Sequence, residues 1–271
     1  MTITEKKEKL KTLIRDCEKV VIGYSGGVDS TFLSKISHDV LGDRLLLVTT
    51  LSETNNNTEL SLIESFVKSH GIPHRFIQTS ELSLPGYAEN PANRCYFCKE
   101  ELYKQLLAVS KQEGIETIFD GSNFDDLADY RPGRKAAREY GIRSPLVEVE
   151  LTKEEIRTLS REMNLPTADR PSSPCLSSRI PYGEVITSEK ILQVRKGEDF
   201  LRTLGFSELR VRHHGQTARI ELSPSLFSTV LKYREEIVTF FREMGFHYIV
   251  LDLEGFRSGR LNEVLHDTAK N

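Results

Sequence analysis

Short apolar runs alternate with amphipathic stretches along the first half of the chain. Runs rich in β-branched residues are typical of buried strands, and apolar residues that recur every three to four positions are typical of helices. The pattern predicts strands at 20–24, 44–50, 74–79, 115–119 and 146–148. It predicts helices at 2–17, about 28–41, 58–70 and 152–163, the last opened by a capping box of Thr152 and Glu155. This alternation indicates an α/β fold with a doubly wound parallel sheet.

The pattern changes after residue 165. The stretch 166–183 holds four prolines and a serine cluster, which is typical of an ordered linker or an active-site loop. Beyond it we expect a short strand near 185, a helix at 188–204, strands at 209–212 and 218–222, a helix at 226–244 and a strand at 247–253. This order resembles a split βαβ unit. We therefore expect an α/β domain at 1–165, a linker or active-site loop at 166–183, and a smaller α+β domain at 184–271 for substrate binding and oligomerisation.

The composition is that of a soluble globular protein. Hydrophobic residues make up 38% and charged residues 28% of the 271 positions, and no apolar run is long enough to cross a membrane. The N-terminus carries charges where a signal peptide needs an apolar core, so we expect a cytoplasmic protein with no membrane partner. The net charge of −3 and the pI near 6.2 argue against a general nucleic-acid binder, which carries a basic excess.

The stretch Ser25-Gly26-Gly27-Val28-Asp29-Ser30 lies between a predicted strand and a predicted helix. Glycines let the backbone come close to an anion, and the start of a helix offers unpaired N–H groups and the positive end of its dipole. The hydroxyl groups of Ser25 and Ser30 add donors, so the stretch predicts a pyrophosphate cradle. It differs from a Walker A loop and from Gly-x-Gly-x-x-Gly, and it resembles the PP-loop of the ATP pyrophosphatases.

Other polar residues follow strands of the predicted sheet. Thr50 ends the second strand, and Gly121 and Asp125 follow the fourth. Because ligands bind at the carboxyl ends of strands in such sheets, we expect these residues near the nucleotide. Paired carboxylates beside a phosphate cradle suit Mg²⁺. Capping and turn chemistry would be the preferred explanation of this segment without the cradle. With the cradle, we favour a nucleotide role that extends to Arg131.

Three of the four cysteines lie in two loops, away from any clear core face. Cys95 and Cys98 follow a loop and open a predicted helix, Cys175 lies in the serine-rich stretch, and Cys17 falls on the apolar face of the first helix. Alone, a Cys-x-x-Cys motif suits a redox pair, half a zinc site or part of an iron–sulfur site. Three cysteines from two loops suit a [4Fe–4S] cluster with one open iron, whereas zinc needs a fourth ligand. Scattered structural thiols remain the alternative.

Arginines mark the second half of the chain. Arg210 and Arg212 lie on one face of a predicted strand, and Arg257 follows the last strand. Guanidinium groups match the geometry of phosphate, so these residues are candidates for an anionic substrate. A solvated strand face explains them equally well.

Five stretches together narrow the resemblance. They are SGGVDS, DGSNFDDLADYRPGRKAAREYG, PCLSSRIPYG, RVRHHGQTARIEL and LDLEGFRSGRLNE. Through them nearly the whole chain resembles the LarE type of ATP-dependent sulfurtransferase, which helps to build the nickel-pincer nucleotide cofactor of lactate racemase. The resemblance implies the PP-loop fold, also described as adenine nucleotide alpha hydrolase-like, for the domain at 1–165. The last two stretches lie outside that fold and separate this family from other PP-loop enzymes.

The resemblance implies a two-step reaction. Mg·ATP adenylates a carboxylate of pyridinium-3,5-biscarboxylic acid mononucleotide and releases pyrophosphate, and sulfur then displaces AMP to give a thiocarboxylate. Asp29 and Ser30 would serve ATP, and the candidates for binding the substrate or its phosphate are Arg210, Arg212, Glu221 and Arg257. The family also implies a homo-oligomer, with a hexamer expected.

Members of this family differ in their sulfur source. Some give up the sulfur of one cysteine, and others load sulfide on the open iron of a three-cysteine cluster. Cys95, Cys98 and Cys175 fit the cluster version, with ATP, Mg²⁺ and [4Fe–4S] as cofactors and sulfide or a sulfur-donor protein as partner. Sacrifice of the Cys175 sulfur is the alternative. Rival functions are a PP-loop tRNA thiolase, an amide-forming synthetase and a zinc-stapled nucleotide sensor. The net charge argues against the first, and the three cysteines argue against the second.

Overall fold

The chain forms two compact units. The computed structural model describes residues 1–55, 57–127, 133–171, 174–257 and 260–262. The first unit comprises Met1–Glu81 and Asn93–Ser173, and the second comprises Leu82–Ala92 and Pro174–Asn271. A short segment from the first third of the chain therefore belongs to the unit that the C-terminal part forms.

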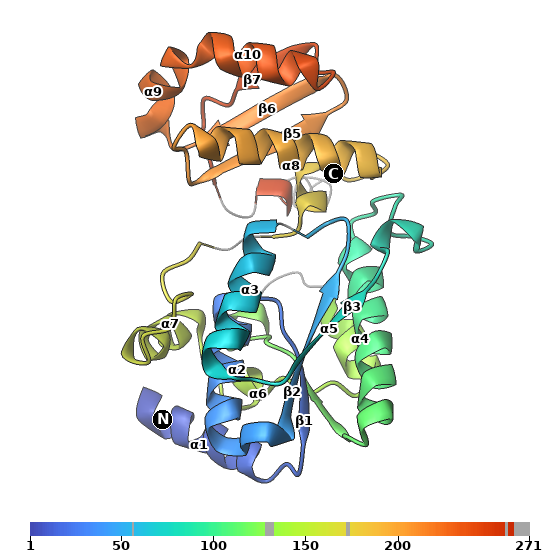
Figure 1. Cartoon of the computed structure of the whole chain (residues 1–271), viewed down its shortest axis with the longest axis vertical. Coiled ribbons are helices and arrows are strands. Elements are labelled where there is room, and N and C mark those ends of the chain that lie inside the picture. Colours follow the sequence, from blue (N-terminus) through green and yellow to red (C-terminus); the bar gives the residue numbers. More distant parts are fainter. Residues whose placement is uncertain (56, 128–132, 172–173, 258–259, 263–271) are drawn as a thin grey trace, which may run out of the picture. The chain divides into compact units, whose positions relative to one another are not determined.

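The first unit is built around a four-stranded parallel sheet (Figure 1). Its strands lie in the order β3-β2-β1-β4, with bounds β1 (Val20–Gly23), β2 (Leu45–Leu51), β3 (His74–Gln78) and β4 (Thr117–Phe119). Val20 pairs with Leu45 on one side and with Thr117 on the other. The chain thus leaves β1 at the point where the strand order reverses, which is where open α/β sheets bind ligands. The predicted α/β fold with a parallel sheet is confirmed.

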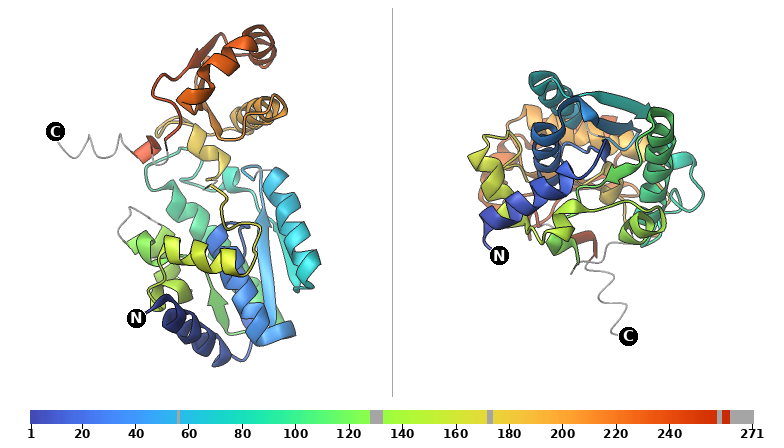
Figure 2. Two further views of the ribbon diagram at one scale, coloured as in Figure 1. Left: turned by 90° about the vertical axis from the view of Figure 1, so that its left-hand side faces the viewer. Right: turned by 90° about the horizontal axis from the view of Figure 1, so that it is seen from below.

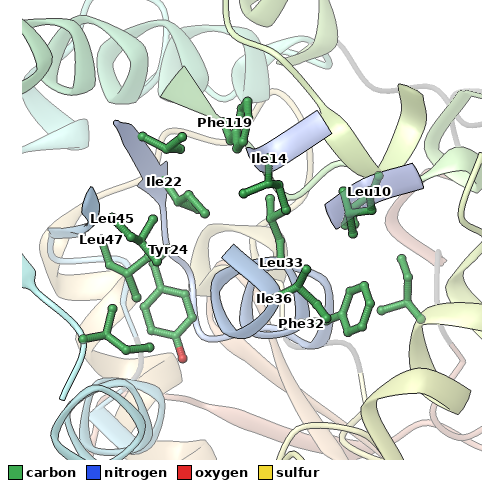
Figure 3. Close-up of a cluster of buried hydrophobic side chains, with 14 of the residues drawn as sticks. Leu10, Ile14, Ile22, Tyr24, Phe32, Leu33, Ile36, Leu45, Leu47 and Phe119 are labelled. Atoms are coloured by element: carbon green, nitrogen blue, oxygen red, sulfur yellow. The ribbon is translucent and has the colours of Figure 1, made fainter. Parts of the chain in front are cut away.

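Alternation along β1 divides the core of this unit between two faces of the sheet. Val20 and Ile22 point to one face and Val21 points to the other. The first face is covered by α1 (Ile3–Arg15), α2 (Val28–Leu41), α3 (Asn57–His70), α6 (Pro145–Glu148) and α7 (Lys153–Glu162). Figure 3 shows part of this cluster, where side chains of α1 and α2 meet those of β1 and β2. The second face is covered by α4 (Arg94–Glu113) and α5 (Gly133–Glu139).

One predicted strand of this unit is wrong. Residues 146–148 form the short helix α6 and not a strand. Pro145 occupies the first helical position, where its fixed φ suits a helix and its missing N–H costs nothing. Arg143, two residues before Pro145, pairs with Phe119 of β4 through a single isolated β-bridge.

The second unit holds a three-stranded mixed sheet covered by helices on one face. The strands β5 (Leu209–His214), β6 (Thr217–Leu222) and β7 (Tyr248–Leu251) lie in that order. The hairpin of β5 and β6 is antiparallel, and β7 runs parallel to β6. The covering helices are α8 (Ser188–Thr203), α9 (Phe227–Lys232) and α10 (Arg234–Glu243). The rings of Phe200 and Phe240 stack 3.9 Å apart, which places α8 and α10 side by side (Figure 2).

Two further predictions differ from the structure of the second unit. No strand forms near residue 185, because Val185 is 54% exposed and the N–H of Ile186 donates to the carbonyl of Ala88. The helix predicted at 226–244 is interrupted at Tyr233, whose backbone leaves the helical region between α9 and α10. The expected split βαβ unit therefore lacks its first strand. No helix within the described ranges has the length and apolar character needed to cross a membrane.

Candidate active site

The PP-loop connects β1 to α2 in the first unit. The N-cap of α2 is Gly27, which has no side chain to accept a hydrogen bond from the first turn. Gly26 has a φ of +73°, and a Cβ there would lie 2.7 Å from Cγ1 of Ile63. Glycine is therefore required at position 26 both by backbone conformation and by close packing. The result is a helix start whose N–H groups remain available to a phosphate.

Two serine hydroxyl groups of the PP-loop contact each other, and a glycine from another segment, Gly121, lies against the loop. Ser25 Oγ and Ser30 Oγ lie 3.1 Å apart, and Ser30 Oγ donates to the carbonyl of Gly27 at 3.2 Å. Gly121 follows β4, and a Cβ on it would lie 3.1 Å from the backbone N of Ser30. The structure thus brings together Ser25, Gly26, Gly27, Ser30 and Gly121 in one unit, as the predicted phosphate cradle requires.

Asp29 forms an ion pair with a residue far along the chain. Its Oδ2 lies 2.6 Å from the Nζ of Lys153, the first residue of α7. The backbone N–H of Lys153 donates to Oδ2 of Asp125 at 2.8 Å, which places Asp125 at the same helix start. Asp29 Oδ1 is buried and has no hydrogen-bond partner among the described residues. A buried carboxylate oxygen without a partner is the kind of hard donor that Mg²⁺ takes.

A buried carboxylate supports the segment after β4. Asp120 accepts hydrogen bonds from Tyr103 Oη at 2.9 Å, Ser144 Oγ at 2.7 Å and Ser122 Oγ at 2.9 Å. Burial, and then the charge of Asp120, raises the pKa of Tyr103 well above its ordinary value, so its phenol stays protonated and donates. This network fixes the position from which Gly121 approaches the PP-loop.

The carboxyl end of β2 contacts the PP-loop through Thr49. Thr49 Oγ1 donates to the carbonyl of Tyr24 at 2.7 Å and accepts from Nε2 of His74 at 2.9 Å. Burial lowers the pKa of His74 to about 4, so its ring is neutral near pH 7. Thr50 is half-buried and, by strand alternation, points to the opposite face of the sheet from Thr49. Arg131, the remaining candidate of the nucleotide site, lies outside the described residues.

The Cys-x-x-Cys motif lies on the first turn of α4, as predicted. Cys95 is exposed and Cys98 is half-buried, and both are thiols rather than halves of a disulfide. The Sγ of Cys98 donates to Oε1 of Glu81 at 3.4 Å. Glu81 is itself buried and accepts a hydrogen bond from Ser52 Oγ at 3.1 Å and another from Thr54 Oγ1.

Cys175 belongs to the second unit, where it is an exposed thiol. It caps the short 3₁₀ helix Leu176–Arg179. Its carbonyl accepts hydrogen bonds from Ser178 Oγ at 2.8 Å and from Nη1 of Arg179 at 3.2 Å. Within the described ranges, no three His, Cys, Asp or Glu side chains are gathered as a metal site would require.

Buried and half-buried arginines gather in the second unit. We use the name arginine cluster for the set Arg179, Arg210, Arg212, Arg219 and Arg260. Arg179 pairs with Glu198 at 2.8 Å, where both side chains are almost fully buried. Glu221 receives Arg212 and Arg219, each at 2.9 Å.

The cluster concentrates positive charge in a buried setting. Burial, and then the charge of Arg179, lowers the pKa of Arg210 to about 10. Burial alone would raise the pKa of Glu198, but Arg179 and then Arg210 hold it below its ordinary value. Arg257 is exposed and pairs with Glu254 at 3.0 Å. Such a set of guanidinium groups suits a phosphate or carboxylate ligand.

The cluster is tied directly to the backbone around Cys175. Arg179 Nη1 also donates to the carbonyl of Pro174 at 2.8 Å, and Arg212 Nη1 donates to the carbonyl of Ser178 at 2.7 Å. One unit therefore carries both an exposed thiol and the groups that suit an anionic substrate.

Comparison with known proteins decides between the candidate families. Residues 3–85 match the NAD synthase family, which agrees with a PP-loop. The pyridinium-3,5-bisthiocarboxylic acid mononucleotide synthase of Lactiplantibacillus plantarum is 36% identical over 265 residues, which cover 97% of this chain and 96% of that protein. The chain belongs to the LarE-type family of ATP-dependent sulfurtransferases.

Two further relatives match most of this chain. An uncharacterised protein of Synechocystis is 44% identical over 97% of this chain and 99% of its own length. A component of the glutamine-hydrolysing GMP synthase of Methanococcus vannielii is 29% identical over 73% of this chain and 67% of that protein.

Two residues of this candidate site are not among those predicted from the sequence. Thr152 and Glu155 showed where α7 begins, but not that Lys153 on its first turn faces Asp29. The sequence predicts Thr50 at the end of β2, whereas its neighbour Thr49 donates to the carbonyl of Tyr24, the residue before the PP-loop. Leu47 packs in the same hydrophobic cluster as Tyr24. Thr49 lies two residues after Leu47 and therefore on the same face of the strand, which would have favoured Thr49 over Thr50.

Proposed function

We propose that this protein adenylates a carboxylate of pyridinium-3,5-biscarboxylic acid mononucleotide with Mg·ATP and then replaces AMP with sulfur to give a thiocarboxylate. The observation that carries the proposal is the 36% identity to the bisthiocarboxylate synthase, because it spans 97% of this chain. Both the PP-loop and the arginine cluster fall within that length.

The first step uses the PP-loop unit. An oxygen of the substrate carboxylate attacks the α-phosphorus of ATP, the bond to the bridging oxygen breaks, and pyrophosphate leaves. The N–H groups at the start of α2 and the hydroxyls of Ser25 and Ser30 would hold the leaving pyrophosphate. Mg²⁺ bound at Asp29 would neutralise its charge, and the unpartnered Oδ1 of that residue fits this role.

The second step uses the arginine cluster. A sulfur nucleophile attacks the activated carbonyl carbon, and AMP leaves with the bonding electrons. Arg210 and Arg212 would hold the anionic groups of the substrate, since guanidinium groups match the geometry of phosphate and carboxylate. Burial, and then the charge of Arg179, lowers the pKa of Arg210, and an added anion would help to balance these charges. Cys175 lies in the same unit, on the loop to which Arg212 donates.

For the sulfur source we propose that Cys95, Cys98 and Cys175 hold a [4Fe–4S] cluster. All three are thiols outside any disulfide, and Cys95 and Cys98 are one helical turn apart, where both reach the same side of α4. These three thiolates would hold the cluster, and its iron without a cysteine ligand would supply a binding site for sulfide.

Sacrifice of the Cys175 sulfur is the second candidate. It is favoured by the exposure of this thiol and by the hydrogen bonds that hold its backbone beside the arginine cluster. In this route Sγ of Cys175 bonds to the activated carbonyl carbon and AMP leaves. A base then removes the Cα proton, the Cβ–Sγ bond breaks, and the thiocarboxylate leaves with the bonding electrons, so that the residue becomes dehydroalanine after one turnover.

Anaerobic reconstitution with iron and sulfide separates the two sulfur routes. The cluster route predicts about four irons per chain, lost in C95A, C98A and C175A. C17A is the matched control, because Cys17 lies in the hydrophobic core and should not affect iron loading. An iron-free wild type that thiolates substrate once, with loss of sulfur from Cys175 by mass spectrometry, would exclude the cluster and establish the sacrificial route.

A further inference from the structure

A segment from between β3 and α4 packs entirely within the second unit. Leu82–Ala92 leaves the unit of its neighbours in sequence and joins the residues that follow Pro174. Its contacts converge on residues 174–186, which we call the Cys175 loop. Ordering the backbone of this segment costs conformational entropy, so the contacts that the segment makes must compensate for that cost.

Asn90 is the centre of these contacts. Its side chain is fully buried, and its φ of +56° is a left-handed conformation that asparagine tolerates better than most residues. Its Nδ2 donates to the carbonyls of Ile180 at 3.3 Å, Pro181 at 2.6 Å and Glu184 at 3.1 Å. Its own carbonyl accepts from the N–H of Gly183 at 2.9 Å. The two N–H groups of this amide are thus shared among three carbonyls that no strand or helix pairs.

Tyr87 makes the second attachment, closer to the thiol. Tyr87 is 1% exposed, and its Oη lies 2.8 Å from Oγ of Ser177, which is also buried. Ser177 is two residues from Cys175, within the same 3₁₀ helix that Cys175 caps. The carbonyl of Ala88 binds the N–H of Ile186 at 2.8 Å, which fixes the far end of the loop.

The loop is therefore held from two directions while its thiol stays exposed. Arg212 binds the carbonyl of Ser178, and Glu198 holds Arg179, a residue of the loop itself. Tyr87 and Asn90 bind the loop from the inserted segment. A thiol that must deliver or accept sulfur at a bound acyl group gains from a fixed position, because small misplacements cost large factors in rate.

We propose that Tyr87 and Asn90 are positioning residues for the sulfur-transfer step. They hold the Cys175 loop in place beside the arginine cluster and take no part in adenylation. The assignment rests on the proposed function, and it holds for either sulfur route, since both use Cys175.

The test compares two half-reactions in Y87F and N90G. Y87F removes only the hydroxyl group, and N90G keeps a residue suited to positive φ while it removes the amide. We expect substrate-dependent exchange between pyrophosphate and ATP to stay within about twofold of wild type. Thiocarboxylate formation in a single turnover should fall roughly fivefold in Y87F and tenfold or more in N90G, in proportion to the buried hydrogen bonds lost.

Hydrogen exchange supplies a readout that does not depend on activity. In cluster-free protein, peptides that span 174–186 should exchange roughly fivefold faster in Y87F, whereas peptides of β1 should be unchanged. Y233F is the matched control, because Tyr233 lies in the same unit between α9 and α10 and its ring contacts Phe206. It should change neither half-reaction nor the exchange of the loop.

Two results would overturn the assignment. One is an equal fall in the rates of both half-reactions together with faster amide hydrogen exchange throughout the chain, which would show a purely structural role. The other is an unchanged rate of thiocarboxylate formation in both variants despite faster amide hydrogen exchange in the Cys175 loop. A wild type that neither exchanges pyrophosphate nor forms thiocarboxylate would instead refute the proposed function itself, and the assignment with it.

Discussion

Replacing Lys153 by methionine removes the cation that Asp29 contacts at 2.6 Å. The variant keeps the length and apolar stem of the side chain but leaves a carboxylate whose Oδ1 already lacks a partner among the described residues. A hydrogen bond between charged groups contributes about 1.5–3 kcal/mol, and solvent screening reduces this because Lys153 is 35% exposed. We therefore expect a loss of about 1–2 kcal/mol in the free energy of unfolding, or roughly 3–6 °C in Tm.

Magnesium nucleotide should reduce this loss. If Mg²⁺ binds Asp29, it supplies the missing positive charge, so K153M should differ less from wild type with saturating Mg²⁺ and α,β-methylene-ATP. Thermal unfolding with and without these ligands measures the difference. K35M is the control, since Lys35 pairs with Asp39 on the same helix as Asp29, and the carboxylate of Asp39 is 43% exposed whereas that of Asp29 is 18% exposed. Its loss should be at most about 0.5 kcal/mol and independent of ligand.

A double-mutant cycle with D29N gives the refuting result. In the D29N background K153M should cost little, because no carboxylate remains to be left unpaired. K153M could lower the free energy of unfolding equally in the wild-type and D29N backgrounds, or by an amount that saturating Mg²⁺ and nucleotide leave unchanged. Either result would show that Asp29, the partner of Lys153, does not bind Mg²⁺ at the PP-loop.

Further predictions concern the loop, the sheet edge and the arginine cluster. G26A should lower stability by about 1–3 kcal/mol and abolish pyrophosphate exchange, because its Cβ would lie 2.7 Å from Ile63 and its φ is +73°. The folded-state pKa of His74 is lowered to about 4 from 6.5, so the unfolded chain binds more protons between these values. Stability should therefore fall as pH falls from about 6.5 to 4, and H74Q should flatten the pH profile of Tm. E198Q should cost about 3–5 kcal/mol by leaving Arg179 buried without its carboxylate.

Each of these predictions has its own contrary result. G42A keeps the left-handed φ strain, but its Cβ would meet nothing within 4 Å, so pyrophosphate exchange as low as in G26A would refute the packing argument. A pH profile of H74Q that equals wild type would show that other groups control acid stability. E235Q removes a 90% exposed carboxylate, and a loss equal to that of E198Q would refute the role of burial.

The strand-loop-helix around the PP-loop was predictable because each of its signals is local. Val20 to Ile22 gave a buried strand, and the glycines gave a turn with little room for side chains. The parallel sheet followed from alternation alone. Side-chain partners between helices far apart in the sequence were not predictable, since the pair of Asp29 on α2 and Lys153 on α7 joins residues 124 positions apart.

The missing strand near residue 185 has a tertiary origin. Val185 and Ile186 resemble a strand, but the N–H of Ile186 is satisfied by Ala88 from an early segment of the chain. Nothing in the sequence around Leu82–Ala92 indicates that this segment packs with the C-terminal residues. Local pattern predicts which backbone groups need partners, but tertiary structure decides where those partners come from.

The most direct test of the proposed function is a single reaction containing pyridinium-3,5-biscarboxylic acid mononucleotide, Mg·ATP and the reconstituted protein with sulfide. Mass spectrometry should show replacement of one oxygen of the substrate by sulfur, with AMP and pyrophosphate released in equal amounts. Formation of ADP and phosphate, release of AMP without a thiocarboxylate, or an amide product formed with ammonia would contradict it.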